Sequence, residues 1–471
     1  MTLAKVRANR RRKSRGFTLI ELTVAMLAGL IVSMALVQIS KEANNTFHEE
    51  VRAAAAEMSL RVTLERLRAD LQRVAFMSTG NLALDPKIAK LAGSTNPLSN
   101  LTGPVPGIQR LAGIQLFYGG STATTPLSAN ANNGLNPDAI ELAGNFSSAD
   151  EFVGFMCPPN GAGCGGPTVC LEQDTPAMWR IRASATANPL LPAQTLQAYF
   201  NPSFYNANPV PGATRFMARV TDDSGRYQYL LTCGGAATTF LGPNNASINI
   251  DPKSQILTIA QTGGRGGVAG FAAGRVFISP VEIIHWQIQQ VTTLPPAPAA
   301  AYNLGAASTP APDPNEYVLT RQYVDAMTNL PDPATLEVVA EYAVDLKFAF
   351  TVDNQIPYNN PPGAFVLGAN PMFFLQLDNP ANAAWAAAPV IPSPTPTIAG
   401  PAPERIRSVR VRAAIRSAFP DRTINITPLP NTGQPYMYRY FIPGTTNGLQ
   451  WARVRTGVTE ASLPNQAMFY W

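Results

Sequence analysis

The chain has 471 residues, of which 46% are hydrophobic and only 14% charged, and it contains 43 prolines and 35 glycines. This composition argues against a helical cytosolic protein and favours a loop-rich, β-rich protein outside the cytoplasm. The net charge of +5 arises in residues 1–15, which hold seven Lys and Arg and no acid, so that the rest of the chain has a net charge of −2. The basic pI is therefore no argument for a nucleic-acid partner.

A long apolar run follows the basic segment. Residues 17–39 contain a single charge, that of Glu21. The run is about long enough to cross a bilayer as a helix. The positive charges before it predict a cytoplasmic N-terminus, with the rest of the chain outside. Because a carboxylate in a membrane span is costly, Glu21 is expected to have a functional role and a partner.

The residues around Glu21 resemble a known signal. Gly16-Phe17-Thr18-Leu19-Ile20-Glu21, behind a basic leader, is similar to the type III signal of type IV pilins and pseudopilins. The resemblance implies that a prepilin peptidase cleaves after Gly16, that the new amino terminus of Phe17 is methylated, and that the apolar helices assemble into a filament. The alternative is an ordinary signal anchor, but residues 40–43 offer no convincing cleavage site and an anchor does not explain Glu21.

Cleavage would place a largely cationic amino group on Phe17. Glu21 lies four residues further along the helix. In a bundle of such helices, Glu21 of one subunit would pair with the amine of a neighbour. Such pairing would offset the burial cost and fix the axial register, a role that buried polar groups can have.

The helix is predicted to continue beyond the membrane. No proline occurs between Phe17 and Pro86, and residues 41–76 are rich in Ala, Glu, Arg and Leu, which favour helix. An apolar stripe with helical spacing predicts packing on a folded domain; it comprises Leu60, Leu64, Leu67, Leu71 and Val74. The expected organisation is a removable leader (1–16), a membrane or filament-core helix (17–40), its amphipathic continuation (41–77) with the helix ending at about Phe76, and a head (78–471).

The head is predicted to consist of short strands between Gly, Pro and Asn clusters. In 406–417, Val409 and Val411 share one face with Ala413, whereas Arg410, Arg412 and Arg416 alternate onto the other, which we interpret as a solvated face rather than an anion site. The resemblance and these patterns together predict an α+β, pilin-like fold with a long N-terminal helix packed on an antiparallel β-rich head. Expected strands are 112–118, 139–142, 179–183, 215–220, 227–232, 255–260, 275–278, 281–291, 316–323, 336–352, 406–417, 436–442 and 452–461.

Four cysteines occur in the part expected to lie outside, where disulfides form. Two disulfides are therefore favoured, with three pairings open. A zinc site is not expected, because the chain lacks close cysteine pairs and has only two histidines, His48 and His285. The candidates are Cys157, Cys164, Cys170 and Cys233.

Two proline-rich stretches, 292–314 and 386–403, are interpreted as long surface loops. Whether residues 80–270 form an inserted subdomain is left open.

Several later segments resemble PilW-type minor pilins in the same order. The resemblance implies a low-abundance subunit that primes pilus assembly at the inner membrane and lies at or near the tip, with a role in twitching motility or adhesion. Implied partners are other minor pilins, the major pilin, the prepilin peptidase and the inner-membrane assembly platform. The protein would reside in the inner membrane before assembly and on the pilus or cell surface afterwards. The segments are 67–76, 284–288, 317–321, 338–345, 406–417 and 453–465.

Three other functions are considered. Residues 80–270 could make the protein a tip adhesin, and the same signal also fits a J-type pseudopilin of a type II secretion system. An anchored enzyme is the weakest alternative, because the sequence lacks a G-x-S-x-G elbow, an H-E-x-x-H motif and a P-loop lysine. We expect no catalytic residue, no cofactor, no metal and no nucleic-acid partner.

Overall fold

The computed structural model describes residues 18–91, 93–117, 137–147, 150–157, 168–172, 175–176, 216–223, 225–232, 247–254, 275–294, 316–352, 366–367, 403–420, 439–442 and 451–466. The expected strands 179–183 and 255–260, and most of both proline-rich stretches, lie outside these residues. The chain divides into two compact units, residues 1–55 and 56–471, and α1 contributes to both.

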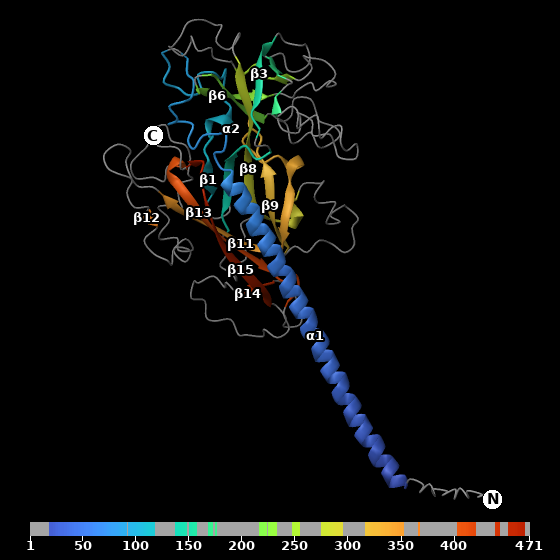
Figure 1. Cartoon of the computed structure of the whole chain (residues 1–471). Coiled ribbons are helices and arrows are strands. Elements are labelled where there is room, and N and C mark those ends of the chain that lie inside the picture. Colours follow the sequence, from blue (N-terminus) through green and yellow to red (C-terminus); the bar gives the residue numbers. More distant parts are fainter. Residues whose placement is uncertain are drawn as a thin grey trace, which may run out of the picture. The chain divides into compact units, whose positions relative to one another are not determined.

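A single helix, α1 (Leu19–Gln72), opens the described chain (Figure 1). It ends at Gln72, four residues before the predicted end at Phe76, because Ala75 adopts a left-handed φ of 57° and leaves the helical path. The Asn465 side chain donates hydrogen bonds to the carbonyl groups of Gln72 (3.1 Å) and Val74 (3.2 Å). A residue almost 400 positions away in sequence therefore satisfies carbonyls that the end of a helix leaves without partners.

The larger sheet is antiparallel, has ten strands and is organised around β8 (Val276–Gln290). The first part of β8 pairs with β3 and β5, and the second part pairs with β2 and β9. Strands from residues 80–270 thus form one sheet with strands from later in the chain. A short helix, α2 (Pro106–Gln109), precedes the first strand. The other strands are β1 (Ile114–Phe117), β2 (Ala139–Gly144), β3 (Phe152–Cys157), β4 (Thr168–Leu171), β5 (Phe216–Thr221), β6 (Tyr227–Thr232), β7 (Ser247–Asn249), β9 (Tyr317–Tyr323) and β10 (Glu337–Glu341).

The smaller sheet has five strands in the order β12-β11-β13-β15-β14. Its central pairs, β11 with β13 and β13 with β15, are antiparallel. The long helix and the two antiparallel sheets confirm the predicted α+β class. The strands are β11 (Ala343–Val352), β12 (Val366–Leu367), β13 (Ile406–Arg416), β14 (Arg439–Phe441) and β15 (Trp451–Ser462).

Two predicted strand boundaries are wrong. The expected strands 275–278 and 281–291 are one strand, β8, in which Pro280 pairs with Ala218 of β5. On the opposite edge of β8, the pairing with β3 ends at Ile278 and the pairing with β2 begins at Glu282. Pro280 lies between these two partners, where the lack of a proline N–H is tolerated. The expected strand 336–352 is two strands, because Tyr342 has a left-handed φ of 55°. This single residue carries the chain from β10 in the larger sheet to β11 in the smaller one. Strands β3, β4, β7 and β12 were not predicted.

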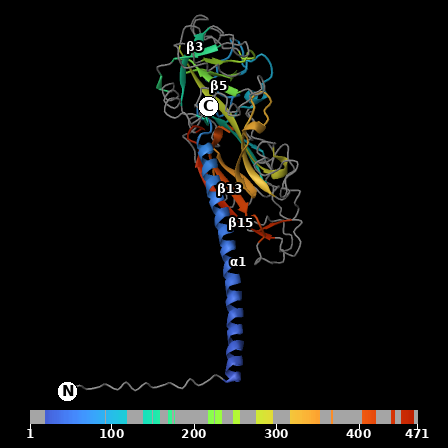
Figure 2. The same cartoon turned by 90° about the vertical axis from the view of Figure 1, so that its right-hand side faces the viewer.

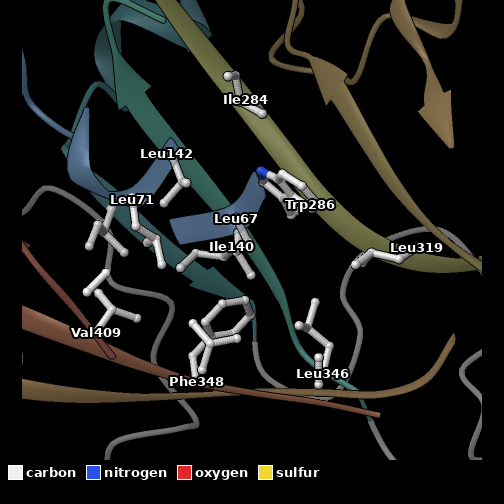
Figure 3. Packing of buried hydrophobic residues seen from close by; sticks show 14 of the residues in the cluster. Leu67, Leu71, Ile140, Leu142, Ile284, Trp286, Leu319, Leu346, Phe348 and Val409 are labelled. Carbon is white, nitrogen blue, oxygen red and sulfur yellow. The ribbon is translucent and has the colours of Figure 1, made fainter. Parts of the chain in front are cut away.

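The main core lies where the second half of α1 meets both sheets. Figure 3 shows Leu67 and Leu71 of α1 between side chains of the larger sheet, such as Ile140, and of the smaller sheet, such as Phe348 and Val409. The predicted stripe is confirmed, since Leu60, Leu67, Leu71 and Val74 are buried and Leu64 packs against them. In both views β13 and β15 run beside this part of α1 (Figures 1 and 2).

The interpretation of the arginine row on β13 as a solvated face is wrong. Arg412 and Arg416 are each 1% exposed. Arg412 pairs with Asp345 at 2.8 Å, and the Arg416 guanidinium stacks over Tyr342 at 4.7 Å. Only Arg410 is partly exposed, with a bond to Glu460 at 3.1 Å. Alternation revealed the apolar face correctly, but it could not show that the charged face is also covered.

A buried ion pair fixes α1 on the larger sheet. The Asp70 carboxylate accepts hydrogen bonds from Arg321 Nε (2.7 Å) and Trp286 Nε1 (3.1 Å). Arg321 also faces Glu337 at 3.6 Å, and Glu337 binds Arg66 of α1 at 3.2 Å. Because a buried charge tolerates only a matched position, these contacts define how the helix is rotated and shifted on the sheet.

A second buried carboxylate, Glu282 of β8, has no cationic hydrogen-bond partner among the described residues. It accepts a hydrogen bond from the Phe146 amide at 3.0 Å and is 3% exposed. Burial raises the pKa of Glu282 to about 7, and hydrogen bonds from Ser147 and Phe146 lower it only in part. About half of the Glu282 carboxyl groups are therefore protonated near pH 7.

Asp70→Asn is expected to destabilise the protein by about 3 kcal/mol, because it removes the close carboxylate charge from the buried Arg321 and leaves Glu337, at 3.6 Å, as the nearer acid among the described residues. Denaturant unfolding monitored by tryptophan fluorescence measures this change. Glu57→Gln, which breaks the exposed Glu57–Arg61 pair on the same helix, is the matched control and should change stability by less than about 0.5 kcal/mol. Equal effects of both variants would contradict the proposed role of Asp70.

Glu282 is expected to make stability pH-dependent. Because its folded-state pKa lies above the usual 4.5, the unfolded chain loses this proton first as the pH rises. The contribution of protonated Glu282 to the free energy of unfolding is complete below pH 4.5. It amounts to up to about 3 kcal/mol and is lost as the pH rises from 4.5 to about 7. Unfolding free energies measured across this range for the native chain and Glu282→Gln test it, since the difference between the two cancels all other titrating groups. A constant difference over the range would refute the assignment.

Candidate functional site in the N-terminal helix

The first part of α1 is apolar and exposed on all sides. Each large apolar side chain from Leu19 to Ile39 is more than half exposed. This part of α1 is long and apolar enough to cross a membrane. An isolated helix that is hydrophobic all round is not stable in water and requires lipid or other helices around it. The candidate site is therefore the exposed apolar surface of this part of α1, which lipid or other helices have to cover.

Glu21 forms part of a capping box at the start of this surface. Thr18 precedes the first helical residue, and its backbone N–H (3.0 Å) and Oγ1 (2.9 Å) both donate to Glu21 Oε2. In return, the Glu21 N–H donates to Thr18 Oγ1 at 3.3 Å. This reciprocal arrangement satisfies N–H groups that the first turn leaves without partners. The spacing Thr-x-x-Glu from Thr18 to Glu21 is the sequence signal for this capping box, which the sequence-based prediction for Glu21 did not include.

The structure does not test the predicted pairing with the N-terminal amine. Gly16 and Phe17 lie outside the described residues. Within them, both hydrogen bonds to the Glu21 carboxylate end on Oε2, so that Oε1 remains available to another donor. Capping and intermolecular pairing are thus compatible with each other.

A second exposed apolar stripe continues beyond the membrane-length run. Phe47, Val51, Met58 and Val62 are 61%, 49%, 70% and 55% exposed. Their spacing of four, seven and four residues places them on one side of the helix. Met58 and Val62 are each two residues from Leu60, which is roughly 200° around the helix and therefore away from the buried stripe. This outer stripe extends the surface that must be covered.

The cysteines lie far from this surface in sequence. Cys170 of β4 is disulfide-bonded and 8% exposed. Cys157 ends β3, next to β4, whereas Cys164 and Cys233 lie outside the described residues. The pairing of the four cysteines stays a prediction.

The described part of the head shows little chemistry of its own. No group of three or more His, Cys, Asp and Glu side chains there is arranged to hold a metal ion. His285 of β8 contacts Glu141 of β2 at 3.0 Å, and both are buried. His48 lies on the exposed helix beside the Phe47 ring.

Comparison with known proteins agrees with this site. Residues 11–37 match a family described as the prokaryotic N-terminal methylation motif. The match includes Gly16, Phe17 and Glu21 together with most of the apolar run. No curated protein and no solved structure matches the chain. The motif and the membrane-length helix support a membrane-anchored structural subunit of the type IV pilin and pseudopilin superfamily, rather than an enzyme.

Proposed function

We propose that this protein is a minor pilin of a type IV pilus that helps to prime pilus assembly and lies at or near the tip. The observation that supports this most is the N-terminal helix, which combines the methylation motif with an apolar surface exposed on all sides. The order of the PilW-like segments favours a minor pilin over a major one. The N-terminus lies in the cytoplasm, the head lies outside, and the peptidase cleaves between Gly16 and Phe17.

The apolar surface explains why such a subunit has two locations. In the membrane, lipid covers residues 19–39. Once the subunit leaves the membrane, the same surface has to be covered by apolar helices of neighbouring pilins, since an exposed apolar area of this size is not stable in water. The outer stripe from Phe47 to Val62 lies beyond the membrane-length run, so that its partner is protein in both locations.

Glu21 gives this assembly its specificity. A buried carboxylate without a partner costs several kcal/mol, and the methylated amine of a neighbouring Phe17 is the cation that the processed filament core offers. Oε2 retains the capping box and Oε1 receives the intermolecular contact. Only helices placed at one axial offset satisfy this pairing, and so the charge sets the register of the subunit.

Glu21→Gln separates the two roles of this residue, because glutamine retains the capping box and loses the charge. In a deletion strain complemented with this variant, membrane insertion is expected to be normal, whereas surface piliation and twitching should be lost. Glu42→Gln, an exposed acid on the same helix, is the control and should restore both. Normal piliation with Glu21→Gln would exclude the charge-pairing role. If the deletion strain keeps its pili and instead fails to secrete enzymes, the protein is a type II secretion pseudopilin.

The outer stripe provides an independent prediction. Met58→Asn is expected to change the stability of the isolated chain by less than about 0.5 kcal/mol, because the side chain is exposed. It should nevertheless reduce incorporation into pili severalfold, measured by immunoblotting of sheared filaments. Leu330→Asn alters a similarly exposed apolar residue of the head, 63% exposed, and should leave incorporation unchanged. Equal incorporation of both variants would mean that the outer stripe makes no contact with neighbouring subunits.

A further inference from the structure

The two sheets of the head are joined by a buried pair of reactive groups. Lys347 of β11 belongs to the smaller sheet, and Asp138 directly precedes β2 of the larger sheet. Lys347 Nζ lies 2.9 Å from Asp138 Oδ1, and their side chains are 2% and 0% exposed. A lysine and an aspartate removed from water to this degree are rare in proteins.

The Asp138 carboxyl group is held from more than one direction. Its backbone N–H donates to the Leu346 carbonyl at 2.7 Å, and the Phe348 N–H donates to Oδ2 at 3.4 Å. Residues on either side of Lys347 thus fix Asp138 in front of the lysine. The amine is directed to Oδ1, and a backbone donor is directed to Oδ2.

The buried residues around Lys347 and Asp138 make a permanent ion pair between these two side chains unfavourable. Arg412, the cross-strand neighbour of Lys347, is buried and already paired with Asp345. Among the described residues, two cations and two carboxylates with side chains at most 3% exposed therefore lie close together, where charged groups lose their hydration. A neutral amide in place of Lys347 and Asp138 would remove two of the four charges and retain the connection between the sheets.

We propose that Lys347 and Asp138 condense to an intramolecular amide bond that covalently joins the two sheets. The ammonium group first transfers a proton to Oδ1, which gives an amine and a carboxylic acid. Nζ then forms a bond to Cγ, the Cγ–Oδ1 bond breaks, and Oδ1 leaves as water with two protons, the one already transferred and a second one from Nζ, while the third proton stays on the amide nitrogen. No oxidant or co-reactant is needed.

The fixed geometry supplies the catalysis. The Nζ–Oδ1 contact of 2.9 Å keeps Nζ beside the carboxyl group that it attacks, and groups held together in this way gain much of the advantage of an intramolecular reaction. The Phe348 N–H is placed to stabilise the negative charge that develops on Oδ2 when Nζ attacks. Oδ2 becomes the amide oxygen and keeps this hydrogen bond. The cross-link does not depend on the proposed function, since it concerns the head alone.

Intact-mass spectrometry of the full chain, extracted in detergent and reduced, tests the proposal. The native chain is expected to be lighter by one water molecule than its sequence requires, relative to a Lys347→Met variant corrected for the substitution. A protease digest should contain one branched peptide that joins Lys347 to Asp138. Lys87→Met, which removes an exposed lysine, is the matched control and should retain the mass deficit.

A second variant defines the chemistry. Asp138→Asn should release ammonia instead of water and give a product with the same mass as the native one. Because the masses are read under denaturing conditions and the native chain alone carries the main result, the test does not depend on the folding of any variant. A native chain without the deficit, or a branched peptide that involves other residues, would overturn the proposal.

Discussion

The structure depends on the burial of one face of α1 between two sheets. Leu60, Leu67 and Leu71 fill the space where the larger and smaller sheets meet, and this burial is the dominant favourable term in the packing of the head. The backbone of β15 comes so close that a side chain on Gly457 would lie 2.7 Å from Leu64. The same helix begins with residues whose apolar side chains have no cover at all. One continuous helix thus has a second half whose apolar stripe is buried and a first half whose apolar side chains are exposed.

Buried charges add positional specificity to that apolar core. Asp70 binds Arg321 and Trp286 at one angle of the helix only. Hydrophobic packing alone tolerates small slips, whereas a buried charge displaced from its partner loses several kcal/mol. The end of the chain completes the arrangement, since Asn465 binds the last carbonyls of α1. The position of the helix is therefore defined by residues from several distant parts of the sequence.

The proposed N-terminal site likewise combines an apolar surface with a single charge, that of Glu21. Glu21 caps its own helix through Oε2, and the cation of the proposed pairing would bind its second oxygen. In the proposed filament, burial of the surrounding apolar side chains would drive association and this one charge would set its register. On this proposal, the subunit would exchange lipid for neighbouring helices without refolding its head.

The amino-acid sequence by itself determined the signal, the long helix, its buried stripe and the antiparallel character of the head, because these depend on local periodicity and on short motifs. Only the tertiary structure showed that Arg412 and Arg416 are buried, since the alternation of β13 is the same whether its second face meets water or protein. It also showed that Tyr342 divides one apparent strand between two sheets and that Pro280 lies within a continuous one. The contacts of Arg412 with Asp345 and of Arg416 with Tyr342, the pairing of Pro280 with Ala218, and the contact of Lys347 with Asp138 each join residues more than 60 positions apart, and no local pattern records such contacts.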